Sequence, residues 1–138
     1  MKTTLFHIAV VAAFAAAGCQ ADEDVPGKVE PLHIEKTEMH FGHQEGTDST
    51  HIKEEGVWID QFSLDTPQDS SFHNVFDYRQ GDTISYDWLQ FCLQRNLIKI
   101  RVEANTHPCQ RKATIGLQLG NSHGTIKIIQ ECSKEKGQ

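Results

Sequence analysis

Hydrophobic and polar residues alternate over much of the second half of the chain. In residues 97–104 the apolar side chains fall at every second position, and residues 112–119 and 125–130 repeat that pattern. A period of two is that of a half-buried β-strand, because successive side chains of a strand point to opposite faces. The residues Gly-Asn-Ser at 120–122 separate the last two segments and are typical of a hairpin turn. The pattern predicts that these three strands form an antiparallel meander.

The N-terminal half has shorter and less regular segments of the same kind. Candidate strands cover residues 34–42, 51–53 and 57–64, and an aromatic-rich segment at 72–78 and an apolar run at 87–93 follow. No segment shows a sustained helical period. Short strands at this spacing predict an all-β domain, an immunoglobulin-like antiparallel β-sandwich. A domain of about 100 residues is long enough to bury a core between two sheets.

The first residues have the anatomy of an export signal. Lys2 gives a positive charge, residues 5–17 form an almost unbroken apolar run, and small residues precede Cys19. The run is shorter than the roughly 20 residues that cross a membrane. Residues 16–19, Ala-Ala-Gly-Cys, resemble the lipobox of bacterial lipoproteins, with Ala16 where that pattern has leucine. The resemblance implies that Cys19 is the lipid anchor and the mature N-terminus. The alternative is an ordinary secretory signal with a chance cysteine.

The residues that follow the lipobox predict a tether and then one domain. Residues 20–24, Gln-Ala-Asp-Glu-Asp, resemble the surface-export signal of Bacteroidetes lipoproteins, although a solvated linker has the same composition. We therefore expect an exported lipoprotein of the outer membrane or cell surface. The predicted organisation is a lipoprotein signal peptide at 1–18, a flexible acidic tether at 19–33, the β-sandwich at 34–133 and a disordered tail at 134–138.

Acidic residues outnumber basic ones. The chain has 13 Lys and Arg against 19 Asp and Glu, for a net charge of −6. Loss of Lys2 with the signal peptide leaves 12 against 19, so the mature part carries −7. Nucleic acids and anionic lipid surfaces select clusters of Lys and Arg, and no such cluster is visible along the sequence. We expect no nucleic-acid partner, and contact with a membrane only through the lipid anchor.

Three cysteines follow the lipobox, and an exported domain can oxidise one pair of them. With the turn at 120–122, Arg111 lies opposite Cys132, and Cys109 is a diagonal neighbour at about 7–8 Å. That separation is at the limit of bridging, and local fraying of the strands would close it. We predict a disulfide between Cys109 and Cys132, with Cys92 as a reduced core thiol.

The C-terminal strands resemble a known family of bacterial surface modules. The matching features are Trp88-Leu89, the segments 98–105, 111–115 and 125–130, and Gly56-Val57-Trp58-Ile59 as an earlier tryptophan strand. Together they resemble the BACON domain, an immunoglobulin-like module of Bacteroidetes surface proteins. The long insertion between the two tryptophans and the pair Cys109 and Cys132 depart from that pattern. The resemblance implies binding of carbohydrate or of a glycoprotein such as mucin at the cell surface.

Three marker residues of that pattern are explained by folding alone. Asn105 is expected to end a strand, where its side chain bonds its own backbone and tolerates a left-handed turn. The stem of Arg111 is expected to cover apolar surface, and Gln130 to satisfy a sheet edge. These residues favour the fold and say nothing of function.

Catalytic and metal-binding motifs are absent from the sequence. It has no nucleophile elbow, zinc-protease motif, phosphate-binding loop or dinucleotide fingerprint. The histidines that invite a metal interpretation are His33, His40, His43 and His51. His40 and His43 lie three residues apart, so on a strand they point to opposite faces and cannot readily share a metal. We expect no enzyme activity, no catalytic residue, no metal and no cofactor.

The aromatic segment at 72–78 is the one feature that exceeds the needs of packing. Aromatic rings beside amides and carboxylates suit sugars, since ring faces stack on C–H surfaces and polar groups bond hydroxyls. The even spacing of Phe72, Phe76 and Tyr78 instead favours a strand face buried in the core. We expect Phe76 in the core and Tyr78, whose hydroxyl needs a partner, nearer the surface. Trp58 is a further ligand-binding candidate, although it too is typical of a core tryptophan.

Two hypotheses for function follow. The first is a lipid-anchored cell-surface protein whose β-sandwich binds carbohydrate or glycoprotein. The second is a structural spacer, or an accessory subunit of a surface complex, without affinity for glycans. An exposed aromatic pair near residues 72–78 would favour the first hypothesis, and burial of every Trp and Phe would favour the second.

Overall fold

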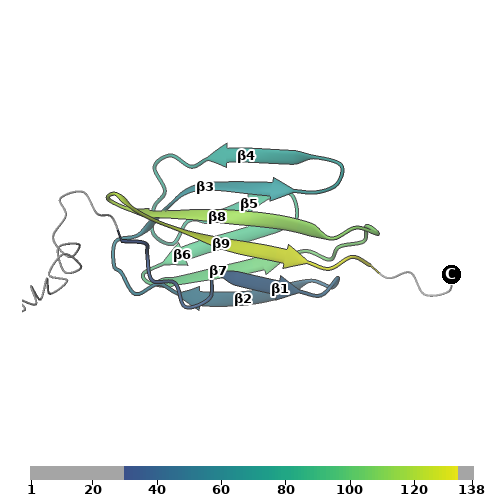
Figure 1. The fold of residues 1–138 in the computed structure, drawn as a ribbon, viewed down its shortest axis with the longest axis horizontal. Helices are drawn as coiled ribbons and strands as arrows, with labels where there is room; N and C mark the ends of the chain where they lie inside the picture. The colour runs from purple at the N-terminus through teal and green to yellow at the C-terminus, as the bar shows by residue number, and fades with distance from the viewer. Residues whose placement is uncertain (1–29, 134–138) are drawn as a thin grey trace, which may run out of the picture.

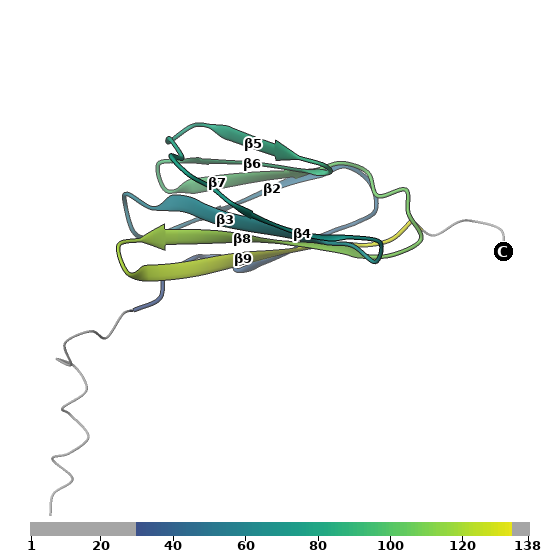
Figure 2. The same cartoon turned by 90° about the horizontal axis from the view of Figure 1, so that it is seen from above.

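The computed structural model describes residues 30–133, which form two layers of β-strands (Figures 1 and 2). The predicted signal peptide, Cys19, most of the predicted tether and the predicted tail lie outside the described residues. The strands are β1 (Glu38–Phe41), β2 (Gly46–His51), β3 (Trp58–Asp65), β4 (Ser70–Asn74), β5 (Thr83–Tyr86), β6 (Leu89–Gln94), β7 (Leu97–Val102), β8 (Arg111–Leu119) and β9 (Ser122–Gln130).

The two layers are a five-stranded sheet in the order β1-β9-β8-β3-β4 and a four-stranded sheet in the order β2-β7-β6-β5. Figure 2 shows the two sheets face to face. The predicted all-β sandwich is confirmed. β1 pairs with β9 in parallel, whereas the other strand pairs of the described chain are antiparallel. No helix within residues 30–133 is long and apolar enough to span a membrane.

The predicted meander is wrong, because β7 and β8 belong to different sheets. β8 and β9 do form the expected hairpin, but β7 pairs with β2 and β6 in the opposite layer. Residues 103–110 carry the chain from one sheet to the other. Alternation defines which side chains of a strand are buried, and both sheets bury one face against the same core. The pattern alone therefore does not distinguish a hairpin from a crossing between sheets.

Three two-residue turns close the hairpins β5–β6, β6–β7 and β8–β9. The first residue of each turn has a left-handed backbone: φ is 52° at Asp87, 56° at Arg95 and 57° at Gly120. Such turns match the twist of the strands that they join. In the last of them Leu119 pairs with Ser122, so the predicted three-residue turn is one residue shorter.

The core lies between the sheets and receives alternate side chains from both. Ile98, Ile100 and Val102 of β7 are fully buried, as the alternation predicts. Ile115 and Leu117 of β8 belong to the same buried cluster. Burial of each such side chain contributes about 1.5–3 kcal/mol, and this packing fixes the outer faces on which ligands can bind.

A buried polar network ties the two sheets together at the end where the chain crosses between them. The guanidinium of Arg111 lies 4.4 Å from the ring centre of Trp88 and donates to Gln130 Oε1 at 2.8 Å. Arg111 and Gln130 both donate to the carbonyl of Glu103 at 2.8 Å. Burial lowers the pKa of Arg111, and the carboxylates of Asp87 and Glu103 partly oppose that shift. These side chains therefore serve the fold.

Asn105 makes the expected side-chain bond to nearby backbone, but not in a left-handed conformation, and it has a further role. Its φ is not positive, and its side-chain amide donates to the carbonyls of Cys109 and Glu131 at 2.9 and 3.0 Å. Its own side-chain oxygen accepts from the backbone N–H of His107 at 3.2 Å. The residue thus joins the crossing loop to the end of β9.

Candidate functional site

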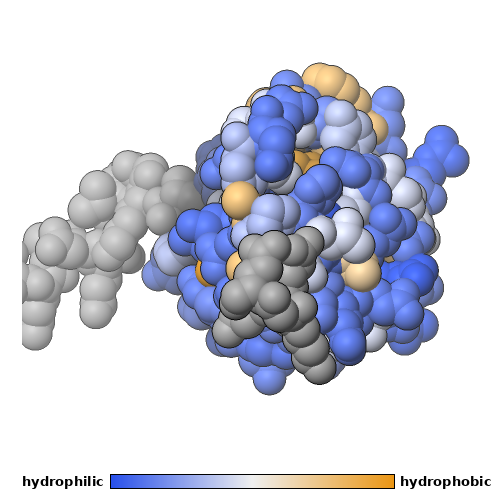
Figure 3. Space-filling model, turned by 90° about the vertical axis from the view of Figure 1, so that its right-hand side faces the viewer, coloured by the Kyte–Doolittle hydropathy of each residue, from blue (hydrophilic) through white to orange (hydrophobic). Residues whose placement is uncertain are grey.

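Exposed aromatic rings line the outer side of the edge strand β4. The side chains of β4 alternate, so that Ser71 and His73 point inward while Phe72 and Asn74 point outward. Phe72 is 60% exposed, and Phe76, which follows the strand, is 82% exposed. Figure 3 shows hydrophobic surface at the upper edge, where β4 lies, on a face that is otherwise mostly hydrophilic. The prediction that Phe76 lies in the core is wrong.

Trp58 lies at the same end of this edge as Phe76. Asn74 pairs with Gln61, and the backbone N–H of Val75 donates to the carbonyl of Asp60 at 2.8 Å. Continuing that antiparallel direction brings Phe76 to the level of the first residues of β3, where Trp58 is 37% exposed. We call Trp58, Phe72 and Phe76 the aromatic edge.

Polar side chains lie beside the aromatic edge, on a β-bulge of β3. The bulge lies between Ile59 and Gln61, so that Asp60 is an extra residue opposite β8. Asp60 and Gln61 lean over Gly116, since a Cβ there would come within 2.7 Å and 2.5 Å of them. One carboxylate oxygen of Asp60 is buried without a hydrogen-bond partner among the described residues. The bulge therefore holds an amide and a carboxylate next to Asn74.

Tyr78 does not belong to the aromatic edge. Its hydroxyl donates to the carbonyl of Asp82 at 2.6 Å and accepts from the backbone N–H of Leu93 at 2.8 Å. Its ring packs against the core. Burial raises the pKa of Tyr78 to about 12. The expectation that Tyr78 is the surface candidate of the segment is thus wrong, and the residue has a structural role.

His73 closes the gap between the two sheets at the same edge, and sequence reasoning missed it. Its ring stacks on Phe62 with centroids 4.7 Å apart and lies 4.1 Å from the ring of Tyr86 on β5. Its Nε2 is buried without a partner among residues 30–133. His73 follows Phe72 directly on the strand, so the alternation of side chains could have predicted that His73 points inward.

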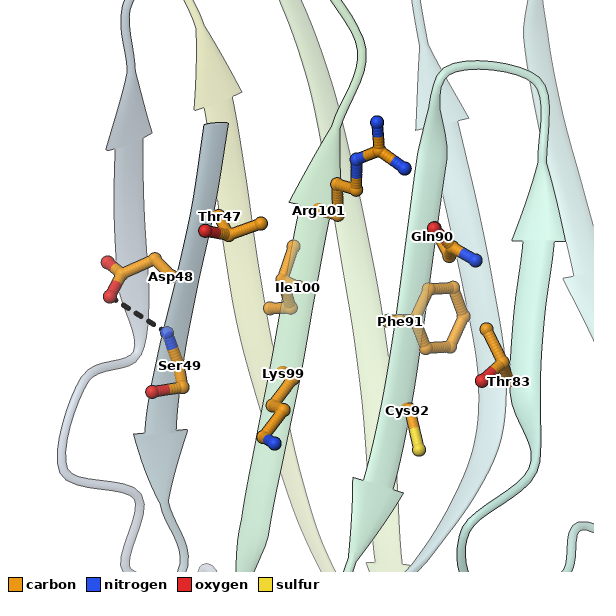
Figure 4. A pocket seen from close by; sticks show the side chains of 10 residues that line it. All are labelled: Thr47, Asp48, Ser49, Thr83, Gln90, Phe91, Cys92, Lys99, Ile100 and Arg101. Carbon is orange, nitrogen blue, oxygen red and sulfur yellow. Dashed lines mark hydrogen bonds between the residues drawn. The ribbon is translucent and has the colours of Figure 1, made fainter. Parts of the chain in front are cut away.

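A groove of about 540 Å³ lies on the outer face of the four-stranded sheet (Figure 4). Its lining comes from all four strands, and the cross-strand register sorts the outward side chains into two rows. One row is Thr47, Arg101 and Gln90, and the other is Ser49, Lys99, Cys92 and Thr83. Two cations thus stand among hydroxyl, amide and thiol groups. Sequence reasoning did not find this site, because its residues come from four separate segments.

Asp48 borders the groove, but its carboxylate is already paired with Lys36. In Figure 4 its carboxylate points away from Lys99. It accepts from Lys36 Nζ at 2.7 Å and from the backbone N–H of Ser49 at 2.8 Å. The hydrogen bond from Lys36 holds the pKa of Asp48 below its usual value, although burial opposes the shift. The groove therefore presents Lys99 and Arg101 with no free carboxylate between them.

Three of the four candidate histidines, all of them exposed, lie beside a glutamate, whereas His43 forms no salt bridge within residues 30–133. Their neighbours are Glu54 for His33, Glu38 for His40 and Glu35 for His51. The hydrogen bond from His33 lowers the pKa of Glu54. Within residues 30–133, no group of three His, Cys, Asp or Glu side chains is arranged to hold a metal ion.

The three cysteines of the described chain are free and half-buried. Cys92 lies in the groove and not in the core, so the core position expected for it is wrong. Cys109 and Cys132 lie just beyond the paired ends of β8 and β9. Their disulfide stays a prediction.

Comparison with known proteins supports the fold and goes no further. No family model matches the chain, and no curated protein matches its sequence. Its structure is similar to the NMR structure of a protein from Bacteroides thetaiotaomicron, with a TM-score of 0.65 and 17% sequence identity. The match covers 81% of this chain and 97% of that protein. At this identity the likeness shows a shared two-sheet β-sandwich.

Proposed function

We propose that this chain is a lipid-anchored cell-surface protein of the BACON type, whose sandwich binds carbohydrate or glycoprotein without catalysing a reaction. The observation that carries the proposal is the aromatic edge. A strand at the edge of a sheet invites unwanted pairing, and natural proteins usually protect such strands with charge or cover. β4 instead exposes Phe72, and Phe76, two residues after the strand, is exposed as well. Exposed rings in that position are best explained by a ligand that covers them.

The chemistry of the edge suits a sugar. A pyranose presents C–H groups on its faces and hydroxyls around its rim, so it needs ring faces and polar groups close together. Phe72 and Phe76 supply the rings, and they lie four positions apart in the chain, so their backbones are at most about 14 Å apart. Asn74 lies between them, and Gln61 is its neighbour on β3. Amide groups both donate and accept, as sugar hydroxyls require.

The test is a glycan array with purified residues 20–138, followed by titration of Phe72→Ala and Phe76→Ala against the glycans that bind. Each variant should lose affinity by about 2- to 10-fold, the range expected for one aromatic contact. Because both rings are exposed, the free energy of unfolding should change by no more than about 0.5 kcal/mol. Phe76→Tyr keeps a ring at the same place and is the matched control, which should bind as the parent does.

The outcome separates the two hypotheses. If no glycan binds the parent protein, or if both alanine variants bind as it does, the aromatic edge is not a sugar site. The structural spacer or accessory subunit then becomes the better interpretation of the sandwich.

A further inference from the structure

The outer face of the four-stranded sheet carries two cations, Lys99 and Arg101, whose cross-strand neighbours are all uncharged. Lys99 faces Ser49 on one side and Cys92 on the other. Arg101, two residues further along β7, faces Thr47 and Gln90. Residues two apart on a strand share a face at a spacing of about 7 Å. Both side chains line the groove, and in Figure 4 the guanidinium of Arg101 and the ammonium of Lys99 point toward opposite ends of it.

On the five-stranded sheet, in contrast, two lysines lie opposite carboxylates on the neighbouring strands. Lys112 of β8 lies opposite Asp65 of β3, and Lys127 of β9 lies opposite Glu38 of β1. Opposite charges across strands are the usual arrangement on a solvated sheet face. Among the salt bridges within residues 30–133, none involves Lys99. In a chain with a net charge of −6, the groove is thus an exception to the general distribution of charge.

Four carboxylates lie near the groove. Asp87 and Glu103 line an adjoining hollow together with Arg101, and both also act on the guanidinium of Arg111. Glu45 accepts from Arg101 at 3.2 Å, but both side chains are more than half exposed. An exposed pair of this kind contributes little, about 0–1 kcal/mol, so another anion can compete for the arginine. Asp48 is bound to Lys36 at 2.7 Å. Both cations are therefore accessible to a ligand.

We infer that this groove is a second binding site, which takes the sulfate or carboxylate group of an acidic glycan. The forked guanidinium of Arg101 matches two oxygens of such a group, and the ammonium of Lys99 adds a point charge. Thr47, Ser49 and Gln90 flank the cations and hydrogen-bond the hydroxyls of the sugar that carries the anion. A hollow that holds both cations and groups that hydrogen-bond hydroxyls fits an acidic sugar better than it fits a bare anion.

The size of the groove fits this ligand class. Its volume of about 540 Å³ lies within the roughly 300–1,000 Å³ of small-ligand sites, enough for one or two sugar rings. The site rests on the proposed glycan-binding function and specifies its ligand. It lies on the opposite sheet from the aromatic edge, so the two sites can fail separately.

The experiment compares lactose with sulfated lactose by calorimetric titration of the full-length protein in detergent at about 50 mM salt. Sulfated lactose should bind at least about tenfold more tightly than lactose. The variant Lys99→Gln with Arg101→Gln should remove that preference, and about 300 mM salt should weaken it. Lys127→Gln, on the other sheet, is the matched control and should keep the preference. Thermal unfolding checks that each variant is folded.

Cys92 gives a second measurement, because it lies directly across the strand from Lys99. Sulfated lactose should slow alkylation of Cys92 by N-ethylmaleimide and leave Cys109 unaffected, as resolved by peptide mass mapping. A disaccharide bearing a uronate in place of the sulfate distinguishes the two anions, and protection by either supports the site.

Several outcomes would overturn the inference. Equal binding of lactose and sulfated lactose, or an unchanged preference in the double variant, shows that the cations do not recognise the ligand. Capture by phosphatidylglycerol vesicles through Lys99 and Arg101, without affinity for sulfated lactose, assigns the groove to anionic lipid. If lactose binds through Phe72 and Phe76 while the groove shows no preference, the proposed function stands and only this site fails.

Discussion

At the scale of single residues, Tyr78 shows how a side chain can replace a missing strand. β5 begins at Thr83, which pairs with Cys92, so the next residue of β6, Leu93, has a neighbouring strand on the β7 side but none on the β5 side. The N–H of Leu93 donates instead to the hydroxyl of Tyr78, while its carbonyl accepts from the N–H of Gly81 at 2.9 Å. A buried N–H without a partner is costly. The phenol therefore stabilises the end of the sheet.

Removal of that hydroxyl should destabilise the fold without touching ligand binding. Tyr78→Phe leaves the N–H of Leu93 unpaired and should lower the free energy of unfolding by about 1–3 kcal/mol. Urea denaturation measures the change, with the exposed Tyr86→Phe as control. A Tyr78→Phe protein as stable as the parent, or one that loses glycan affinity at full stability, would contradict the structural role.

The raised pKa of Tyr78 also predicts a pH dependence. A tyrosine ordinarily ionises at 10.0, and burial raises the pKa of Tyr78 to about 12 in the folded protein. Since the folded-state pKa is the higher one, its stabilising effect is complete below pH 10.0 and is lost as the pH approaches about 12. The chain has two tyrosines, so Tyr86→Phe leaves Tyr78 as the only phenol. Absorbance titration of that variant should show ionisation near pH 12, and near pH 10 once urea unfolds it. Ionisation near pH 10 while it is folded would contradict this.

The residues of this segment also show what alternation can and cannot predict. The even spacing of Phe72 and Phe76 was a sound indication that they share a face. It did not say which face, and on this edge strand the inward positions hold Ser71 and His73. Tyr78 does not follow this alternation, because the preceding residue, Asp77, has a φ of 56° and turns the chain inward. A left-handed residue other than glycine leaves no clear mark in the sequence.

At the scale of elements, the strands themselves were predictable and their partners were not. The segments 97–104, 112–119 and 125–130 correspond closely to β7, β8 and β9. The partner sheet is decided by the crossing loop, where one amide of Asn105 holds two carbonyls at once. The bulge at Asp60 and the parallel strand β1 likewise depend on contacts distant in sequence. The groove, built from four strands, could not be derived before those partners were known.

The last pair of the β8–β9 register lies two residues from each of two cysteines. Arg111 pairs with Gln130, so the same antiparallel register, continued two residues, sets Cys109 opposite Cys132 and not diagonal to it. The side-chain amide of Gln110 donates a hydrogen bond to the carboxylate of Glu131 at 3.1 Å. Asn105 binds the carbonyls of Cys109 and Glu131, which keeps the two segments adjacent. Facing positions on neighbouring strands are within the range that a disulfide spans.

We therefore predict that oxidised glutathione joins Cys109 to Cys132. The two thiols lose two protons and two electrons to the oxidant, and the closed loop should contribute about 3 kcal/mol of stability. Non-reducing peptide mapping identifies the bond, and Cys92→Ser is the control that should still form it. A peptide that links Cys92 to either of the other cysteines would contradict the assignment.

At the scale of the whole molecule, the distribution of charge matters more than its sum. A net charge of −6 argues against anionic partners when it is taken as an average. The fold nevertheless gathers Lys99 and Arg101 on one outer face, while lysines of the other face are matched by carboxylates across the strands. The sandwich thus separates an aromatic edge on one sheet from a cationic groove on the other. Neither surface is apparent from composition.

The place where the chain enters the sandwich decides how an anchor would orient it. The backbone N–H of Leu32 donates to the carbonyl of His123 at 3.1 Å, so the described chain begins beside the β8–β9 turn. A lipid on Cys19 would hold that end nearest the membrane. The outer faces of both sheets would then stay accessible, and the start of β8 would lie at the end farthest from the membrane (Figure 1).

Lipidation of Cys19 is the prediction on which this orientation depends. Several acyl chains on one residue hold a protein firmly, whereas a single chain binds a membrane only marginally. Cys19→Ala should therefore move the protein from the membrane fraction to the soluble fraction and abolish its labelling with radioactive palmitate. Cys92→Ser leaves the lipobox intact and should remain in the membrane fraction with its label. If the Cys19→Ala protein still partitions fully with membranes, another part of the chain holds it there, and the orientation argued from Leu32 no longer applies.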